Sequence, residues 1–429
     1  MNILYDIAFI FFLFFYLPVF FLKRRKREGI LIRLGFYPKS LKALLADKKN
    51  IWVHAVSVGE VLAAGPLIKA LHENRPGYRV VLSVVTETGY RAAKKILPDK
   101  DIALYLPFDL SFIVKKALGY VRPVLLILME TELWPNLILF AHKMKVKVFL
   151  VNGRISDKSF KKYRVIRSLL SPAVKRVGAF CMQTQEYAER IKFLGAPAEK
   201  IKVTGNMKFD GVFQGGISSG GCAGPLAEAL NIEPGQRLIV AGSTHQGEDE
   251  LILNAWANLK KNHTGLKLVI VPRHIERCQD IARLVRRLGC QPVFFSRLQK
   301  GARVSSGQVV VVDVIGILSS IYGIAYMVFV GGSLVRRGGH NIVEPAALSK
   351  PIILGPHTFN FRDMVAVFLE KEAVVIAKDG SSLERIMEGL LKDETRAERL
   401  GQKAALVVKS NTGAAQRTLR IIEHEAIFS

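Results

Sequence analysis

The chain has 429 residues, of which 50% are hydrophobic and 23% are charged, which is typical of a folded protein and excludes a disordered one. This length exceeds that of one ordinary core and predicts about two domains. The formal charge of +26 predicts attraction to a polyanion: nucleic acid, an anionic membrane surface or a phosphorylated lipid.

The first segment is an uncharged apolar run, 7–22, followed directly by the basic cluster KRRKR at 23–27. A cleavable signal peptide carries its positive charges before the apolar run, so this order does not indicate secretion. We predict a membrane-anchor helix with its basic flank over 1–28, which leaves the rest of the chain in the cytoplasm. An N-terminal core helix is the alternative.

After this segment, short β-branched runs alternate with segments of helical period, which predicts parallel sheets covered by helices on both faces. In the first half, the predicted strands are 51–56, 79–85, 102–106, 124–129, 146–151, 178–183 and 201–205. In the second half, they are 237–242, 266–272, 291–296, 308–313, 326–332, 351–355 and 373–377. The pattern predicts an α/β fold with two Rossmann-like, doubly wound domains that face each other across a cleft.

The segment QGGISSGGCAG, 214–224, has few side chains that could pack in a core and indicates a linker. We therefore predict an N-terminal domain over 29–212, a linker over 213–235 and a second domain over 236–395. The helical segment 396–429 is predicted to pack back on the first domain.

The motif HAVSVGE, 54–60, runs from a predicted strand through a turn into a glutamate. Ser57 and Glu60 fit a capping box, which would give this glutamate a purely structural role. Alternatively, a carboxylate just past the carboxyl end of a strand lies where open α/β sheets bind their ligands. The local pattern leaves both interpretations open.

Three more segments of the first half carry polar groups at predicted strand ends. Glu130 and Glu132 follow one strand in METELWPN, NGRISDKSFKKY offers a basic loop, and TGNMKFD contains Lys208. Each segment has a solvated surface as its alternative. An acidic pair beside a lysine can also stabilise a charged transition state.

In the second half, FVGGSLVRRGGHNIVEPAALSKP, 329–351, combines glycines after a strand with a predicted helix start at Asn341 and a carboxylate at Glu344. Glycines let backbone N–H groups approach phosphate oxygens, and a helix N-terminus favours negative charge, although Asn341 and Glu344 also fit a simple cap. Two other strand ends are predicted at the same edge of the sheet, with these polar residues: Ser243, Thr244, His245, Arg273 and His274.

Motifs of common cofactors and metals are missing from the sequence. No G-x-G-x-x-G follows the first strand of either half and no Walker A sequence is present, which disfavours hydride transfer and ATP hydrolysis. The four cysteines form no C-x-x-C pair and have no zinc spacing, so we predict reduced thiols and no metal.

Together, the segments HAVSVGE, METELWPN, NGRISDKS, TGNMKFD, AGSTHQGE, VPRH, GGHNIVEPAAL and GPHTFNF, in this order, resemble the Kdo transferases of lipopolysaccharide synthesis. The resemblance implies a membrane-anchored glycosyltransferase of the GT-B type, with CMP-Kdo as donor and a lipid A precursor (lipid IVA) as acceptor. It implies that the first domain binds the acceptor and the second the CMP-sugar. It implies no cofactor, no metal and no nucleic-acid partner.

The resemblance also implies roles for individual residues. Glu60 matches the general base, and Glu130 and Lys208 match positions that stabilise the transition state. The residues expected to bind the CMP-sugar are Pro272, Arg273, Ile315, Gly316, Ile317, Asn341, Ile342, Val343, Glu344, Ser243 and Gly332. The residues expected to contact the acceptor are Ser57, Gly59, Thr88, Gly89 and Arg154.

Two segments depart from the family pattern. Ile317 stands where the family usually has a carboxylate, so a side-chain contact from this position is not expected, whereas backbone contacts are. The segment TETGYRAA, 86–93, differs from the T-G-S-E form of many members.

A carboxylate within hydrogen-bond reach can deprotonate a sugar hydroxyl in a single inverting displacement. The position of Glu60 at a helix start is expected to keep it ionised. The positive charge is expected to draw the protein to the anionic membrane that holds the acceptor, and residues near Arg33, Phe36 and Tyr37 are expected to contact lipid.

Two other functions share some of these features. A UDP-sugar enzyme, such as a lipid A disaccharide synthase or an epimerase, has the same fold and a similar glycine-rich segment. A non-catalytic, basic membrane adaptor has the same charge but does not need Glu60.

Overall fold

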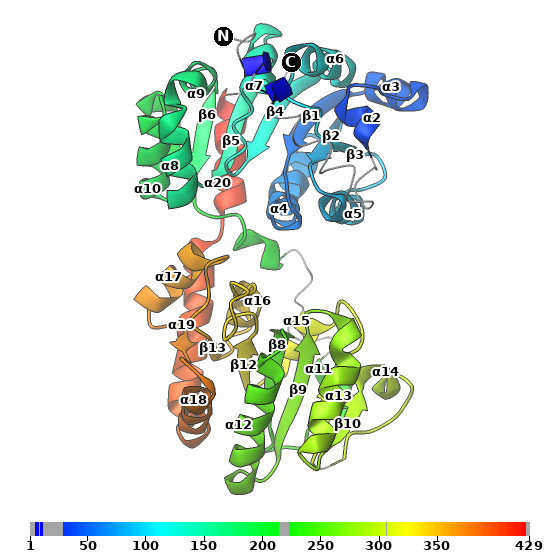
Figure 1. Ribbon diagram of the computed structural model, residues 1–429, viewed down its shortest axis with the longest axis vertical. Helices are drawn as coiled ribbons and strands as arrows, with labels where there is room; N and C mark the ends of the chain where they lie inside the picture. The colour runs from blue at the N-terminus through cyan, green and yellow to red at the C-terminus, as the bar shows by residue number, and fades with distance from the viewer. Residues whose placement is uncertain (1–4, 8, 12–28, 214–222, 306, 426–429) are drawn as a thin grey trace. The chain divides into compact units, whose positions relative to one another are not determined.

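The computed structural model describes residues 5–7, 9–11, 29–213, 223–305 and 307–425 (Figure 1). The chain divides into two compact units: unit 1 is Met1–Gly211 with Asn411–Ser429, and unit 2 is Val212–Ser410. Each unit is built on one seven-stranded sheet. The two predicted α/β sheets are therefore confirmed, while the cleft between them stays a prediction.

In the sheet of unit 1 the strand order is β3-β2-β1-β4-β5-β6-β7, and neighbouring strands run parallel. The strands are β1 (Lys49–His54), β2 (Tyr78–Val84), β3 (Ile102–Tyr105), β4 (Pro123–Met129), β5 (Lys147–Gly153), β6 (Ala179–Met182) and β7 (Ile201–Val203). The chain moves outward from β1 to β3 and then returns to the other side of β1 through β4. The switch point between β1 and β4 is the place where an open α/β sheet binds its ligand.

Helices cover both faces of this sheet because side chains alternate along the buried strands. On β1, Ile51 and Val53 belong to one core cluster with α4 and α5, whereas Trp52 belongs to the other with α6 and α7. The helices of unit 1 are α2 (Ile30–Arg33), α3 (Lys39–Ala46), α4 (Val58–Asn74), α5 (Glu87–Ile96), α6 (Ser111–Val121), α7 (Pro135–Lys143), α8 (Asp157–Val165), α9 (Arg167–Val174), α10 (Gln185–Phe193) and α20 (Ala414–Glu425), with 3-10 turns at Ala198–Lys200 and Asp210–Phe213.

The last helix, α20, is part of unit 1 and contacts α4, β5 and β6 (Figure 1, red). Asp210 accepts hydrogen bonds from the backbone N–H groups of Gly413 (2.6 Å) and Ala415 (2.7 Å), which fixes the start of α20. The predicted C-terminal segment began at residue 396, but the chain joins unit 1 only from Asn411 onward.

The sheet of unit 2 has the strand order β10-β11-β9-β8-β12-β13-β14, again with parallel neighbours. Its strands are β8 (Arg237–Thr244), β9 (Leu266–Pro272), β10 (Gln291–Phe294), β11 (Gln308–Val311), β12 (Met327–Val330), β13 (Ile352–Leu354) and β14 (Val375–Ile376). The switch point of this sheet lies between β8 and β12.

The fourteen strands fall where the sequence predicts them. The helices of unit 2 are α11 (Ala223–Ala229), α12 (Glu248–Asn262), α13 (Cys278–Arg287), α14 (Phe295–Leu298), α15 (Leu318–Gly323), α16 (Val343–Ala347), α17 (Arg362–Glu370), α18 (Gly380–Lys392) and α19 (Glu394–Asn411), with a 3-10 turn at Ile275–Arg277. Helix α11 lies inside the segment 213–235 that was predicted to be a linker.

The predicted membrane anchor, 1–28, lies outside the described residues except for 5–7 and 9–11. In this short part, the Tyr5 hydroxyl donates to Asp109 Oδ2 (2.9 Å), and Asp6 Oδ1 accepts from Asn136 Nδ2 (2.7 Å). Within the ranges that the structure describes, no helix has the length and apolar character needed to cross a membrane.

Candidate active site

Glu60 lies in the first turn of α4, directly after β1 and at the switch point of unit 1. Ser57 is the N-cap of α4 and accepts a hydrogen bond from the Glu60 N–H (3.4 Å). In return, Glu60 Oε1 accepts from the Ser57 hydroxyl (3.1 Å) and Oε2 from the Val56 N–H (2.8 Å). Ser57 and Glu60 therefore do cap α4, and the same hydrogen bonds hold the Glu60 carboxylate at the edge of the sheet where ligands bind.

The surroundings of Glu60 favour its neutral form. Burial raises the pKa of Glu60 to about 7, helped by the negative charges of Glu130 and Glu132 and opposed by the hydrogen bond from Val56. The helix start favours the ionised form, but desolvation and two nearby carboxylates outweigh it and raise the pKa of Glu60 above its usual value. A carboxylate with a pKa close to neutral is well matched to proton transfer at neutral pH.

Glu130 and Lys208 form an ion pair beside Glu60. Lys208 Nζ lies 2.9 Å from Glu130 Oε1, and both side chains are mostly buried. Glu130 (φ 51°), which directly follows β4, and Asn152 (φ 51°), near the end of the neighbouring strand β5, both have left-handed backbone conformations. Non-glycine residues rarely adopt this conformation, and such strain clusters at functional sites.

Asn152 also positions the loop that carries Lys208. Its Oδ1 accepts a hydrogen bond from the Met207 N–H (3.0 Å), and its backbone carbonyl accepts one from Gln183 Nε2 (3.0 Å). The Asn152 side chain is fully buried, and its bond to Met207 fixes the loop after β7 against the end of β5. No pattern in the sequence predicts this role for Asn152.

The predicted acceptor contacts lie at the starts of α4 and α5 and in the loop after β5, on the same edge of the sheet as Glu60. Gly59 and Thr88 are exposed, and Arg154 is half-buried. Gly89 has a structural reason to be glycine, because a Cβ there would lie 2.8 Å from Thr86 Oγ1 and 3.3 Å from the Val56 carbonyl oxygen. Contact of these residues with an acceptor stays a prediction.

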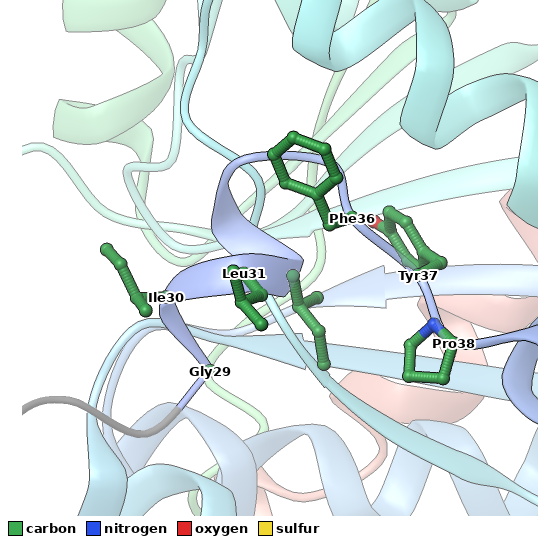
Figure 2. Close-up of a pocket in the computed structure, with 7 residues that line it drawn as sticks. Gly29, Ile30, Leu31, Phe36, Tyr37 and Pro38 are labelled. Atoms are coloured by element: carbon green, nitrogen blue, oxygen red, sulfur yellow. The ribbon is translucent and has the colours of Figure 1, made fainter.

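A pocket of about 520 Å³ lies on another part of unit 1, around α2 (Figure 2). Leu31 (62% exposed) and Phe36 (57% exposed) present apolar side chains there. Tyr37 and Arg33 are buried, and the Arg33 guanidinium donates to the Val85 carbonyl and stacks on the Tyr105 ring. Within this surface, Leu31 and Phe36 are thus exposed while Arg33 and Tyr37 are not, and contact of the surface with lipid stays a prediction.

In unit 2, a buried carboxylate that the sequence analysis missed organises the switch point. Glu248, in the first turn of α12, accepts hydrogen bonds from four backbone N–H groups: those of His245 (2.8 Å), Gly332 (2.7 Å), Ser333 (3.0 Å) and Leu334 (2.9 Å). The Gly332 N–H, which we expected to approach a phosphate, is thus already paired. The signal in the sequence was the position of Glu248 shortly after Thr244, at the start of a helix. A carboxylate there can accept hydrogen bonds from the N–H groups of a loop.

Glycines let the ends of β8 and β12 touch. A Cβ on Gly331 would lie 2.5 Å from the Ser243 carbonyl oxygen, and one on Gly332 would lie 3.1 Å from the His340 ring. Ser243 itself has a left-handed backbone (φ 57°). Close approach of the β8 backbone accounts for Gly331, and a left-handed backbone (φ 69°) beside the His340 ring accounts for Gly332. Contact of Gly332 with a nucleotide stays a prediction.

Three histidines meet above this contact. His245 Nε2 lies 2.9 Å from His340 Nε2, with the rings stacked, and the His274 ring centroid lies 5.8 Å from that of His245. Burial and the positive charge of Arg273 lower the pKa of His340 to about 4, so the ring is neutral. Arg273 is exposed at the end of β9 and lies close enough for its charge to lower the pKa of His340.

The other predicted nucleotide-binding segments adjoin one another. Glu344 accepts hydrogen bonds from Asn341 Nδ2 (3.2 Å) and from the Ser319 hydroxyl, which follows the segment 315–317. Asn341 was expected to be the N-cap, but α16 begins at Val343 with Ile342 as N-cap, and Asn341 Oδ1 accepts the Val343 N–H (3.1 Å).

The side chains of these segments differ in their exposure to solvent. Ile315 is 84% exposed, and Gly316 (φ 95°) has open space where a Cβ would lie. Pro272, Ile342 and Val343 are buried, so only their backbone atoms could reach a ligand.

Residues 28–211 match the family model described as "3-Deoxy-D-manno-octulosonic-acid transferase (kdotransferase)". A 3-deoxy-D-manno-octulosonic acid transferase from Haemophilus influenzae is 35% identical over 402 residues, which cover 93% of this chain and 92% of that protein. The chain belongs to the Kdo transferase family. The resemblance stated from the sequence motifs is thereby confirmed.

Solved structures of low identity share the fold of this Kdo transferase family member. A glycosyltransferase from Rickettsia africae is 15% identical, with 89% of this chain and 100% of that chain covered and a TM-score of 0.57. A UDP-GlcNAc 2-epimerase from Neisseria meningitidis is 13% identical, with 87% and 99% covered and a TM-score of 0.59. The GT-B-type fold is thus confirmed, but it is common to proteins with different activities.

Proposed function

We propose that this family member is an inverting glycosyltransferase that moves Kdo from CMP-Kdo to a lipid A precursor, lipid IVA. Membership of the Kdo transferase family supports the reaction class and the donor. The observation that carries the mechanism is the group at the switch point of unit 1, where Glu60, with a pKa raised to about 7, lies beside the Glu130–Lys208 ion pair.

In the proposed reaction, Glu60 accepts the proton of the acceptor hydroxyl as its oxygen bonds to the anomeric carbon of Kdo. The bond from that carbon to the phosphate oxygen breaks, and CMP leaves with the electron pair. Lys208, held by Glu130, places a positive charge where the transition state needs one. No step in this scheme requires a cofactor or a metal, and their absence stays a prediction.

Unit 2 is proposed to bind CMP-Kdo at its own switch point. Exposed Arg273 offers a planar, permanently charged group for the phosphate or the sugar carboxylate. Glu344, which accepts a hydrogen bond from Asn341 Nδ2, is proposed as the carboxylate that accepts the ribose hydroxyls. Ser243 and the segment 315–317 border this edge of the sheet.

The membrane location is also a proposal. The charge of +26, the apolar run at 7–22 and the exposed side chains of Leu31 and Phe36 support binding to the anionic inner membrane from its cytoplasmic face. Leu31→Ser/Phe36→Ser is expected to reduce sedimentation with anionic vesicles and turnover of the lipid acceptor. Unchanged sedimentation and turnover would remove this surface from the proposal.

Glu60→Gln tests the catalytic role. With CMP-Kdo and lipid IVA, we expect kcat to fall on the order of 10²–10⁴-fold, the usual contribution of a general base, while CMP binding by calorimetry stays unchanged. Glu73→Gln, an exposed glutamate on the same helix, is the matched control. Mass spectrometry of the lipid product counts the sugars added.

The same assay separates the two alternatives. A UDP-sugar enzyme, whose fold the epimerase shares, would turn over UDP-sugars and not CMP-Kdo. A membrane adaptor would show no turnover with either donor, and Glu60→Gln would not change its binding to the membrane.

A further inference from the structure

Helices α6 and α7 of unit 1 begin at the edge of the sheet that carries the candidate active site, and neither has a cap of its own. Their N-cap residues, Leu110 and Trp134, make no side-chain cap hydrogen bond. Helix α7 is capped instead by the buried Asp109, whose carboxylate accepts from the N–H groups of Asn136 (3.0 Å) and Leu137 (2.8 Å). A helix start needs such an acceptor because its first N–H groups have no partner within the helix.

The acceptor for α6 comes from the N-terminal segment, 105 residues away in the chain. Asp6 Oδ1 accepts from the Ser111 N–H (3.1 Å) and from Asn136 Nδ2 (2.7 Å), so one carboxylate joins the starts of α6 and α7. The Tyr5 hydroxyl donates to Asp109 Oδ2 (2.9 Å), the same oxygen that caps the Asn136 N–H. The N-terminal segment therefore completes the hydrogen bonding at both helix starts.

Apolar contacts hold the same segment against α6. Phe9 packs against Leu110 and Ile113. Its ring also stacks on that of Tyr5, with the centroids 5.8 Å apart. Ile10, by contrast, is exposed. The segment thus contacts unit 1 through particular side chains, as a docked element does, whereas a free tether needs only an apolar composition.

The start of α7 is also the end of the loop that carries two carboxylates of the candidate site. Glu130 and Glu132 lie in this loop, 130–134, which joins β4 to α7. Trp134 Nε1 donates to Glu132 Oε2 (2.8 Å), and Glu130 forms the ion pair with Lys208. A connection this short takes its geometry from the strand and the helix at its two ends. A displaced helix start would therefore displace these groups.

We propose that Asp6 and Tyr5 are positioning residues of the reaction, which dock at the starts of α6 and α7 and thereby hold the loop 130–134 in its catalytic geometry. The N-terminal segment then supports the chemical step itself, separately from any attachment to a membrane. The inference rests on the proposed roles of Glu130 and Lys208 in transfer.

Asp6→Leu tests this role, because leucine cannot accept a hydrogen bond and makes the segment more apolar. Assays in detergent micelles with saturating CMP-Kdo and lipid IVA exclude attachment to a bilayer as a cause. We expect kcat to fall on the order of 10-fold, since small displacements of catalytic groups lower the rate, and KM for CMP-Kdo to stay unchanged. Asp6→Asn, whose amide oxygen can accept both hydrogen bonds, is expected to keep most of the rate.

Hydrogen exchange shows whether the loss of rate passes through the two helix starts. In Asp6→Leu we expect faster exchange at the amides of Ser111, Asn136 and Leu137, with undiminished sedimentation on anionic vesicles. Tyr5→Phe, which removes a single hydroxyl, is a milder second variant, for which a smaller loss of kcat and faster exchange at the same amides are expected. Ile10→Ala, at an exposed position of the same segment, is the control and is expected to change neither kcat nor exchange.

Three results overturn the inference. They are full kcat in both Asp6→Leu and Tyr5→Phe, a loss of kcat with unchanged exchange at the start of α7, and equal losses of kcat in Asp6→Leu and Ile10→Ala. The proposed function fails differently. If Glu60→Gln keeps its rate, the assignment of the base is wrong, whatever Asp6→Leu does. If Glu60→Gln is inactive while Asp6→Leu keeps its rate, only the inference about the N-terminal segment is wrong.

Discussion

Lys208 Nζ lies 2.9 Å from Glu130 Oε1, which joins the loop after β7 to the strained end of β4 at the switch point of unit 1. We expect Lys208→Met, which keeps the apolar stem and removes the charge, to lower kcat on the order of 10²–10³-fold, as loss of a preorganised transition-state contact does. Steady-state kinetics with CMP-Kdo and lipid IVA measures this. Lys202→Met, at an exposed lysine on β7, is the control, and equal rates for the two variants would contradict the assignment.

The pH dependence of the wild type follows from Glu60. Its pKa is raised to about 7, and a general base works only when ionised, so kcat/KM should rise with pH and level off above neutrality. At pH 6, about one tenth of the molecules carry the carboxylate and the rate should be lower in proportion. Rates measured from pH 5 to 9 in buffers of constant ionic strength test this. An acid limb near pH 4.5, where an ordinary glutamate titrates, would contradict the raised pKa of Glu60.

Glu248 is predicted to hold the loop after β12 in place. In Glu248→Gln the amide cannot accept all four N–H groups, and a buried bond to a charged group is worth roughly 1.5–3 kcal/mol. We expect faster hydrogen exchange at 332–334 and weaker CMP binding. Glu250→Gln, exposed on the same helix, should change neither, and equal exchange in both variants would contradict the prediction.

Gly331 is predicted to tolerate no side chain. Its Cβ would lie 2.5 Å from the Ser243 carbonyl oxygen and 2.6 Å from the Thr244 Cα, so Gly331→Ala must push β8 and β12 apart. Such overpacking costs about 1–3 kcal/mol, and we expect the melting temperature to fall by several degrees. Gly323→Ala, with no atom within 4 Å of the new Cβ, is the control. Equal melting curves would show that the contact relaxes freely.

Several features could be predicted from local pattern. The apolar runs that fix the strands are short and bounded by turns, and Ser57 caps α4 because its side chain suits the N-terminus of any helix. The family motifs also predicted that Glu130 and Lys208 belong to the site. The two residues are far apart in the chain, and their Oε1 and Nζ atoms lie 2.9 Å apart in the fold.

Other features depend on residues that meet only in the folded chain. The pKa of Glu60 is set by burial and by Glu130 and Glu132, which come from another strand end, so a rule about helix starts could not give it. Arg33 looks like a surface cation in the sequence, yet its guanidinium is buried against Tyr105.

By itself, the sequence determined the alternation of strands and helices, the family and the identity of the candidate catalytic groups, because each of these is written in local period or in short motifs. Only the tertiary structure decided which groups are charged, which amides are free and which glycines are needed for contact. Charge state, hydrogen-bond occupancy and close approach are properties of neighbours in space. Parallel sheets place those neighbours at the ends of strands that are distant in the chain.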